Sequence, residues 1–282
     1  SFTWKQTYER CKRFASYLAG HGIGHGDTVA AMLPNIPAMN ELHFAVPMTG
    51  AVLNALNIRL DAASIAFQLD HGGARIILVD PEFAGVIAEA LTLMEGPKPF
   101  VIDVDDAAFS GGKRIGAIEY EAAVAAGDPA FAERPPADEW NAIALSYTSG
   151  TTGNPKGVVT HHRGAYLNDV SNILAGNLGQ HPVYLWTLPM FHCNGWCFPW
   201  SIVLQAGVQV CLRRVASDTI FAALADHGVT HLCGAPIVLN MLVHAPEGVK
   251  RRFDRTIEVA TGGAAPPSAV IEAMERMGFR VS

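Results

Sequence analysis

Short apolar segments alternate with segments of helical periodicity along most of the chain. Strands are predicted at eight such segments, at 27–33, 51–56, 75–79, 100–104, 184–188, 208–212, 229–233 and 257–260. Helices are predicted between them, at 5–20, 37–50, 64–71, 83–94, 162–174, 221–227 and 236–244. Strands that alternate with helices of ordinary length form mainly parallel sheets. The sequence therefore predicts an α/β fold.

The length of 282 residues and the hydrophobic content of 50% allow two such α/β lobes with substantial cores. The lobes are predicted to interleave, the first at about 26–180 and the second at about 1–22 plus 181–282. Ser64 is the predicted cap of the helix at 64–71. The looser region 105–140 has an alanine-rich centre that is typical of a surface helix, and it receives no chemical role.

The segment 147–157 contains three glycines, several hydroxyl side chains and a lysine, and apolar runs precede and follow it. Glycines let the backbone direct several N–H groups at one anion, and hydroxyls and a lysine add donors and positive charge. This is the chemistry of a loop that holds nucleotide phosphates. The alternative is a flexible turn between two strands, which an arbitrary cluster of glycine, serine and threonine would favour. The density of donors and Lys156 favour the phosphate loop.

Two familiar nucleotide motifs are excluded at this loop. In G-x-x-x-x-G-K-[ST] the second glycine would fall on Pro155, and Gly157 follows Lys156 where a hydroxyl should stand. The dinucleotide pattern G-x-G-x-x-G is also absent. The loop instead resembles the signature [ST]-S-G-[ST]-T-G-x-P-K-G of the adenylate-forming superfamily, in its acyl-CoA synthetase branch. The resemblance assigns phosphate binding to Thr148, Ser149, Gly150, Thr151, Thr152, Gly153 and Lys156.

A second motif, at 189–196, follows a predicted strand, where α/β sheets bind their ligands. Taken alone, His192 is more often a satisfied core or surface histidine, and Trp196 has an ordinary core tryptophan as its alternative. The segment resembles the P-[ML]-F-H-x-N-[AG]-W version found in fatty-acyl-CoA synthetases, in which the tryptophan gates an acyl tunnel. The resemblance implies an acyl pocket at His192, Gly195 and Trp196.

The third motif, at 260–267, carries a double glycine after a predicted strand. A tight turn with proline at the start of a helix is its plain interpretation. In the superfamily, a G-G-[AS]-x-P segment at this place packs against adenine. The resemblance therefore implies adenine binding at Gly262, Gly263 and Ala264. Of the histidines at 161 and 162, one matches a family histidine, and a role at the start of the following helix is favoured for it.

The resemblance implies a reaction in two steps. A carboxylate, expected to be a medium- or long-chain fatty acid, attacks ATP to form an acyl-adenylate, and coenzyme A then displaces AMP. The expected catalytic residues are Thr152, Lys156 and His192, since donors aimed at developing charge accelerate such a step. Mg²⁺ would offset phosphate charge, with Thr152 as a weak ligand and the main one expected beyond Ser282. A homodimer is the candidate assembly, because relatives are often dimers.

The net charge of −6, without a basic block, argues against nucleic acid as the main partner. No apolar run is long enough to span a bilayer. Five scattered cysteines favour a reducing compartment, and a cytoplasmic location is expected. Cys193 and Cys197 lack a second pair of ligands at metal spacing, so zinc is not expected.

Both ends of the chain interrupt apparent structure, at Phe2 and Trp4 and again at 279–282. The chain is interpreted as an incomplete amino-terminal domain without the family's carboxy-terminal lid domain, and it is expected to be inactive by itself. Alternatives are an aryl-acid ligase or a peptide-synthetase adenylation domain, a nucleotide-binding module without catalysis, and the disfavoured phosphate-loop NTPase.

Overall fold

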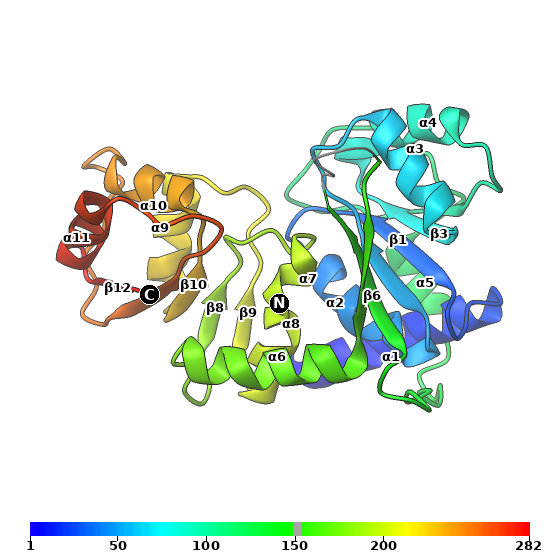
Figure 1. Cartoon of the computed structure of the whole chain (residues 1–282), viewed down its shortest axis with the longest axis horizontal. Coiled ribbons are helices and arrows are strands. Elements are labelled where there is room, and N and C mark those ends of the chain that lie inside the picture. Colours follow the sequence, from blue (N-terminus) through cyan, green and yellow to red (C-terminus); the bar gives the residue numbers. More distant parts are fainter. Residues whose placement is uncertain (149–153) are drawn as a thin grey trace. The chain divides into compact units, whose positions relative to one another are not determined.

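The computed structural model describes residues 1–148 and 154–282. The chain divides into two compact units, and each contains its own sheet (Figure 1). Unit 1 comprises Ser1–Ala165 and Phe191–Asn194, and unit 2 comprises Tyr166–Met190 and Gly195–Ser282. The predicted α/β fold with mainly parallel sheets is confirmed.

The sheet of unit 1 has the strand order β5-β4-β3-β1-β2-β6-β7 in the described part of the chain. Its strands are β1 (Thr28–Met32), β2 (Val52–Ala55), β3 (Ala74–Val79), β4 (Phe100–Asp103), β5 (Ile118–Glu119), β6 (Ala142–Tyr147) and β7 (Gly157–His161). All neighbours are parallel except β6 and β7, which are antiparallel. The central strands are buried along their length, which explains why they appear in the sequence as continuous apolar runs.

Helices and short 3₁₀ turns connect these strands. They are α1 (Trp4–Gly20), α2 (Pro37–Ala45), η1 (Pro47–Thr49), α3 (Ala62–His71), η2 (Pro81–Phe83), α4 (Ala84–Leu93) and α5 (Tyr120–Ala126). The helices α3 and α4 pack on β1 and β3 through a buried cluster that includes Ile65, Leu69, Ile77 and Ile87. This cluster is one core of unit 1.

Helix α1 belongs to unit 1, and its predicted assignment to the second lobe is wrong. Its buried face includes Phe14 and Leu18, and the ring of Phe14 lies 4.8 Å from that of Tyr120 on α5. The guanidinium of Arg10 pairs with Glu41 on α2. These contacts join segments that are distant in sequence, so local periodicity could not have assigned the helix to a lobe. The long segment of unit 1 also ends at Ala165 rather than near residue 180, and Phe191–Asn194 returns to this unit.

One local prediction in unit 1 is corrected, and another is confirmed. The cap of α3 is Asp61, whose carboxylate accepts a hydrogen bond from the Ser64 backbone N–H at 2.7 Å. A carboxylate is as good an N-cap as a hydroxyl, and here it stands at the position that the chain geometry requires. The alanine-rich centre of 105–140 forms α5, a surface helix as predicted, with Tyr120, Ala123 and Val124 on its buried face and Glu121, Ala122, Ala125 and Ala126 exposed.

The sheet of unit 2 is parallel throughout its described strands and has the order β12-β11-β10-β8-β9. Its strands are β8 (Val183–Leu185), β9 (Val208–Val210), β10 (His231–Cys233), β11 (Ile257–Ala260) and β12 (Phe279–Val281). Its helices are α8 (Phe198–Leu204), α9 (Ser217–Asp226), α10 (Pro236–Val243) and α11 (Ser268–Arg276). A second buried cluster, with Phe221, Leu239, Ile257 and Met274 among its members, packs α9, α10 and α11 on the sheet.

Two helices cross the division of the chain, α6 (His162–Ala175) and α7 (Cys193–Trp196). The Nδ1 atom of His161 accepts a hydrogen bond from the Gly164 N–H at 2.9 Å, which satisfies a free donor of the first turn of α6. His161 therefore has the predicted role at the start of the helix. Throughout 1–148 and 154–282, no helix is both long and apolar enough to span a membrane.

Candidate functional site

The predicted phosphate loop begins and ends on the antiparallel strands β6 and β7 of unit 1. Tyr147 is the register partner of Gly157, and the backbone N–H of Thr148 donates to the Lys156 carbonyl at 3.1 Å. Both Thr148 and Lys156 are exposed. The other predicted phosphate ligands, Ser149, Gly150, Thr151, Thr152 and Gly153, lie outside the described residues. The structure thus describes the stem of the loop, in which the lysine directly precedes the outgoing strand β7.

Aromatic contacts support the last residue of β6. The Tyr147 hydroxyl lies 2.9 Å from Nδ1 of His71 at the end of α3, and the ring of Phe67 approaches both rings. Burial raises the pKa of Tyr147. On the opposite strand, a Cβ added at Gly157 would lie 3.2 Å from Leu145 and 3.7 Å from His71. The stem is therefore packed on a side where only a small residue fits comfortably.

The predicted acyl-pocket residue His192 lies in unit 1 and is exposed. Two residues further on, Asn194 is buried with 3% of its surface exposed. The Ser146 hydroxyl of β6 donates to Asn194 Oδ1 at 2.7 Å, one residue before the loop stem. Neither Ser146 nor Asn194 was predicted as a site residue from the sequence, although Asn194 is a specified position of the motif at 189–196.

The motif at 189–196 continues into a left-handed turn. Cys193, Asn194, Gly195, Trp196 and Cys197 have φ values of 42°, 45°, 58°, 53° and 66°. Left-handed helical backbone costs L-residues roughly 1–2 kcal/mol each, and it is rarely continued beyond one residue. Four of these five residues are not glycine, so the surrounding structure must hold the turn. Backbone strain of this kind is common at functional sites, and here it occurs at the predicted acyl pocket.

Within unit 2, the turn brings Trp196 against the predicted adenine-binding segment. A Cβ added at Gly262 would lie 2.5 Å from Cη2 of the Trp196 indole, and one added at Gly195 would lie 2.8 Å from the ring of Trp186. Glycine is therefore required at both positions by close ring packing. The structure thus brings together Trp196, which the sequence assigned to the acyl pocket, and Gly262, which it assigned to adenine binding.

The remaining adenine-binding candidates lie just after β11. Gly263 has a φ of +85°, a conformation that glycine adopts without strain, and Gly263 and Ala264 are both exposed. Helix α11 begins at Ser268, shortly after the two prolines at 266 and 267. The segment therefore offers a backbone surface without large side chains, on which a flat ring can lie.

An acidic residue, Asp169 of α6, is buried in unit 2 with 4% of its surface exposed. Its Oδ1 atom lies 3.5 Å from the Ser201 hydroxyl, at the limit of a hydrogen bond. Burial raises the pKa of Asp169 from 3.8 to about 8. The carboxyl group is thus held in its protonated form near neutral pH.

Replacing Asp169 with asparagine is expected to flatten the dependence of stability on pH. The unfolded chain releases this proton near pH 3.8, while the folded protein retains it up to about pH 8. The protonated carboxyl group therefore makes its full contribution to stability below the pKa of the unfolded chain, 3.8. That contribution is lost as the pH rises through the pKa of the folded protein, about 8. Thermal unfolding between pH 5 and pH 9 should show the substituted protein gaining stability over the parent as the pH rises. Parallel curves for the two proteins would contradict this expectation.

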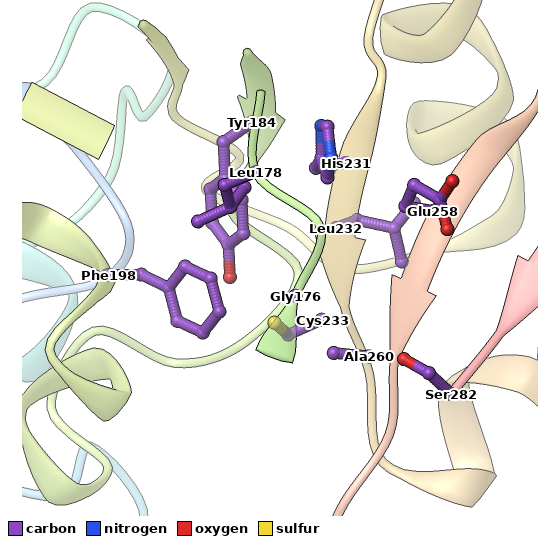
Figure 2. Close-up of a pocket in the computed structure, with 10 residues that line it drawn as sticks. All are labelled: Gly176, Leu178, Tyr184, Phe198, His231, Leu232, Cys233, Glu258, Ala260 and Ser282. Carbon is purple, nitrogen blue, oxygen red and sulfur yellow. The ribbon is translucent and has the colours of Figure 1, made fainter. Parts of the chain in front are cut away.

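A small pocket in unit 2 opens beside β8, β10 and β11 (Figure 2). The rings of Tyr184 and Phe198 stack beside it at 5.0 Å, and the Cys233 thiol faces it. It offers about 10 Å³ to water-sized molecules, so it holds one water at most and no acyl chain. Burial raises the pKa of Cys233 to about 12, and the thiol is therefore not a nucleophile at neutral pH.

Mg²⁺ is expected at the phosphates of the bound nucleotide. In the described ranges, no group of three or more histidine, cysteine, aspartate or glutamate side chains is arranged to hold a metal ion. The predicted weak ligand, Thr152, lies outside those ranges.

Comparisons with known proteins cover the full chain. Residues 1–282 match the family described as AMP-binding enzyme. The chain is 50% identical to the peroxisomal acetate/butyrate–CoA ligase AAE7 of Arabidopsis thaliana, over 100% of this chain and 52% of that protein. It is 43% identical to the peroxisomal trans-cinnamate:CoA ligase of Petunia hybrida, over 99% of this chain and 52% of the relative. The chain thus spans about half the length of these curated relatives.

The fold is similar to that of a solved structure. The N-terminal domain of FACL13 from Mycobacterium tuberculosis superposes with a TM-score of 0.85 at 22% identity, over 99% of this chain and 67% of that one. At this identity the similarity shows the fold alone.

The comparisons correct one expectation and establish the family. The predicted cytoplasmic location is contradicted, because the names of AAE7 and two other relatives place those proteins in the peroxisome. The five scattered cysteines had indicated only a reducing compartment, and that property does not distinguish one reducing compartment from another. From the match over its full length, the chain belongs to the AMP-binding enzyme family, as its phosphate-loop signature predicted.

Proposed function

We propose that the full-length protein is an acid–CoA ligase that activates a carboxylic acid with ATP. The observation that carries the proposal is the contact between Trp196 and Gly262 within unit 2. Trp196 is predicted to line the site of the acid, and Gly262 is predicted to contact adenine. Acid and adenine are the two ends of an acyl-adenylate, so one compact arrangement of residues would contact both ends of the intermediate.

The proposed reaction overcomes the poor electrophilicity of a carboxylate. A carboxylate oxygen bonds to the α-phosphorus of ATP, and the bond from that phosphorus to the bridging oxygen breaks, which releases pyrophosphate. The coenzyme A sulfur, after losing its proton to solvent, then bonds to the acyl carbon, and the bond from that carbon to the phosphate oxygen breaks, which releases AMP. Lys156 is proposed to stabilise the phosphate charge that develops in the first step, together with the hydroxyls of Thr148, Ser149, Thr151 and Thr152. His192 is proposed to contact the acid, and Gly263 and Ala264 the adenine.

The identity of the acid is a separate part of the proposal. The motif at 189–196 favours an aliphatic acid, and the relatives are named for acetate, butyrate and trans-cinnamate. We therefore propose a short- or medium-chain aliphatic acid, with an aryl acid as the second candidate because of the 43% identical cinnamate ligase.

The test is a screen for pyrophosphate release by the full-length protein. Acids from acetate to palmitate are compared with cinnamate, with and without coenzyme A. We expect release to depend on the acid, and acyl-CoA to form only when coenzyme A is present. If pyrophosphate forms equally fast without any carboxylate, the protein is not an acid–CoA ligase.

Replacing Trp196 with alanine is expected to change which acid is preferred. The indole is only partly buried, and it provides an apolar wall whose removal enlarges the acid site. One methylene group in an apolar pocket changes kcat/KM by roughly 10-fold or more. The ratio of kcat/KM for octanoate to that for butyrate should shift by a factor of that order, while the KM for ATP changes little.

The matched control for this substitution is Trp4→Ala on α1, which removes an exposed tryptophan from unit 1. It should leave the acid preference unchanged. A loss of ATP affinity in Trp196→Ala without a change in acid preference would contradict the role proposed for the indole.

A further inference from the structure

Two side-chain amides of α6 hold the left-handed turn that carries Trp196. The Nδ2 atom of Asn172 donates to the Trp196 carbonyl at 2.6 Å, and Nδ2 of Asn168 donates to the same oxygen at 3.3 Å. Residues four apart lie on one face of a helix, so both amides project from the same side of α6. A single backbone oxygen thus has two side-chain donors, both from one rigid element.

The carbonyl that they hold lies within the strained part of the backbone. Trp196 has a φ of 53°, and the residues on either side of it also have positive φ. Such a backbone persists only where neighbouring groups determine it. The next carbonyl, that of Cys197, is bonded differently, since it accepts the Trp200 and Ser201 N–H groups at the start of α8. The amides of α6 therefore act on Trp196, the residue of the turn that directly precedes Cys197, the N-cap of α8.

The position of the indole depends on this backbone. A Cβ atom added at Gly262 would lie only 2.5 Å from Cη2 of the Trp196 indole. The ring therefore has little room on the side of Gly262. A rotation of the peptide at Trp196 would either press the ring against the Gly262 backbone or move it away. Releasing the carbonyl should therefore change the shape of the acid site without changing any atom of the indole.

We propose that Asn172, assisted by Asn168, is a positioning residue that fixes the Trp196 backbone and thereby determines which acids the site accepts. This inference rests on the proposed ligase function for its substrate, and on the contacts of α6 for its mechanism. Neither asparagine touches the acid in this scheme, because both act through the carbonyl of Trp196.

The first test measures acid preference in the full-length protein. Asn172→Ala removes the donor and Asn172→Asp replaces it with a group of the same shape that does not donate when ionised. The control is Ser171→Ala, an exposed neighbour whose hydroxyl bonds to the Leu167 carbonyl of its own helix. We expect both Asn172 variants to shift the octanoate-to-butyrate ratio of kcat/KM by about tenfold, as the loss of one hydrogen bond allows. The KM for ATP should stay within about twofold of the parent.

A double substitution separates positioning from a general structural role. In a Trp196→Ala background, Asn172→Ala should add less than about twofold to the change in acid preference, since the residue it positions is gone. If Asn172→Ala shifts the ratio equally with and without the indole, Asn172 does not act through Trp196 and the proposal is wrong.

A second readout does not require activity. Hydrogen exchange of the peptide covering 193–204 should be faster in Asn172→Asp and in Asn168→Ala than in the parent, and unchanged in Ser171→Ala. Unchanged exchange in both asparagine variants would overturn the proposal even in a fully active ligase. Faster exchange in a protein that shows no acid-dependent release of pyrophosphate would reject the ligase function while supporting the contacts of α6.

Discussion

Replacing Lys156 with alanine is expected to lower kcat/KM for acid-dependent release of pyrophosphate by roughly 10²–10³-fold, the effect of losing one donor aimed at developing negative charge. The side chain of Lys156 is exposed, and its backbone carbonyl is held by the Thr148 N–H at 3.1 Å. The hairpin bond does not involve the side chain. The substitution should therefore remove a positive charge from the loop and leave its stem folded.

Two further variants determine whether the positive charge of Lys156 is responsible for the expected loss of kcat/KM. Lys156→Arg keeps the charge but distributes it over a planar group, so its activity should lie between those of the parent and the alanine variant. Lys98→Ala removes an exposed lysine elsewhere in unit 1 and should leave the rate unchanged. A normal rate in Lys156→Ala, measured with saturating acid and limiting ATP, would show that this lysine does not face the phosphates.

Replacing Arg10 with alanine is expected to destabilise the protein by about 3–5 kcal/mol, the usual cost of leaving one member of a buried ion pair alone. The side chain of Glu41 is 2% exposed, and its two oxygens accept from Nε and Nη2 of Arg10 at 2.6 Å and 3.1 Å. The Tyr120 hydroxyl also donates to Glu41 at 2.7 Å. Burial raises the pKa of Glu41, while Arg10 and Tyr120 lower it. Without Arg10, Glu41 should bind a proton more readily, so the loss should be larger at pH 8 than at pH 5.

An exposed ion pair of the same unit provides the control. Arg114 and Asp105 also form an ion pair, with 58% and 44% of their side chains exposed, and such pairs contribute about 0–1 kcal/mol. Chemical denaturation of Arg10→Ala and Arg114→Ala should therefore give midpoints that differ clearly from each other. Equal midpoints would show that the cluster around Glu41 does not stabilise the fold.

Much of the fold could be predicted from periodicity, because buried parallel strands are continuous apolar runs. The strands β1, β3 and β11 and the helices α1, α6 and α10 all fall close to their predicted ranges. The antiparallel strand β7 was not predicted as a strand. It is short and exposed on Val158 and Val159, so the sequence shows no buried run there. Its pairing with β6 depends on the reversal of the chain at the loop.

Some residues around the predicted site could also be predicted from the sequence, and others could not. Those with unusual chemistry in a short motif, such as Lys156, Trp196 and Gly262, could be selected from the sequence. Asn168 and Asn172 could not, because two asparagines four residues apart on a helix are typical of a solvated face. Their partner is a backbone carbonyl more than twenty residues away.

The sequence by itself determined the fold class and the family, since both depend on local patterns: the alternation of strands and helices, and a loop signature specified residue by residue. Only the tertiary structure decided that α1 packs in unit 1, that Trp196 rests on Gly262, and that the amides of α6 hold a left-handed turn. The physical reason is the range of the interactions. Periodicity and turn chemistry act over a few residues, whereas burial and side-chain hydrogen bonds join residues that are adjacent only after the chain has folded.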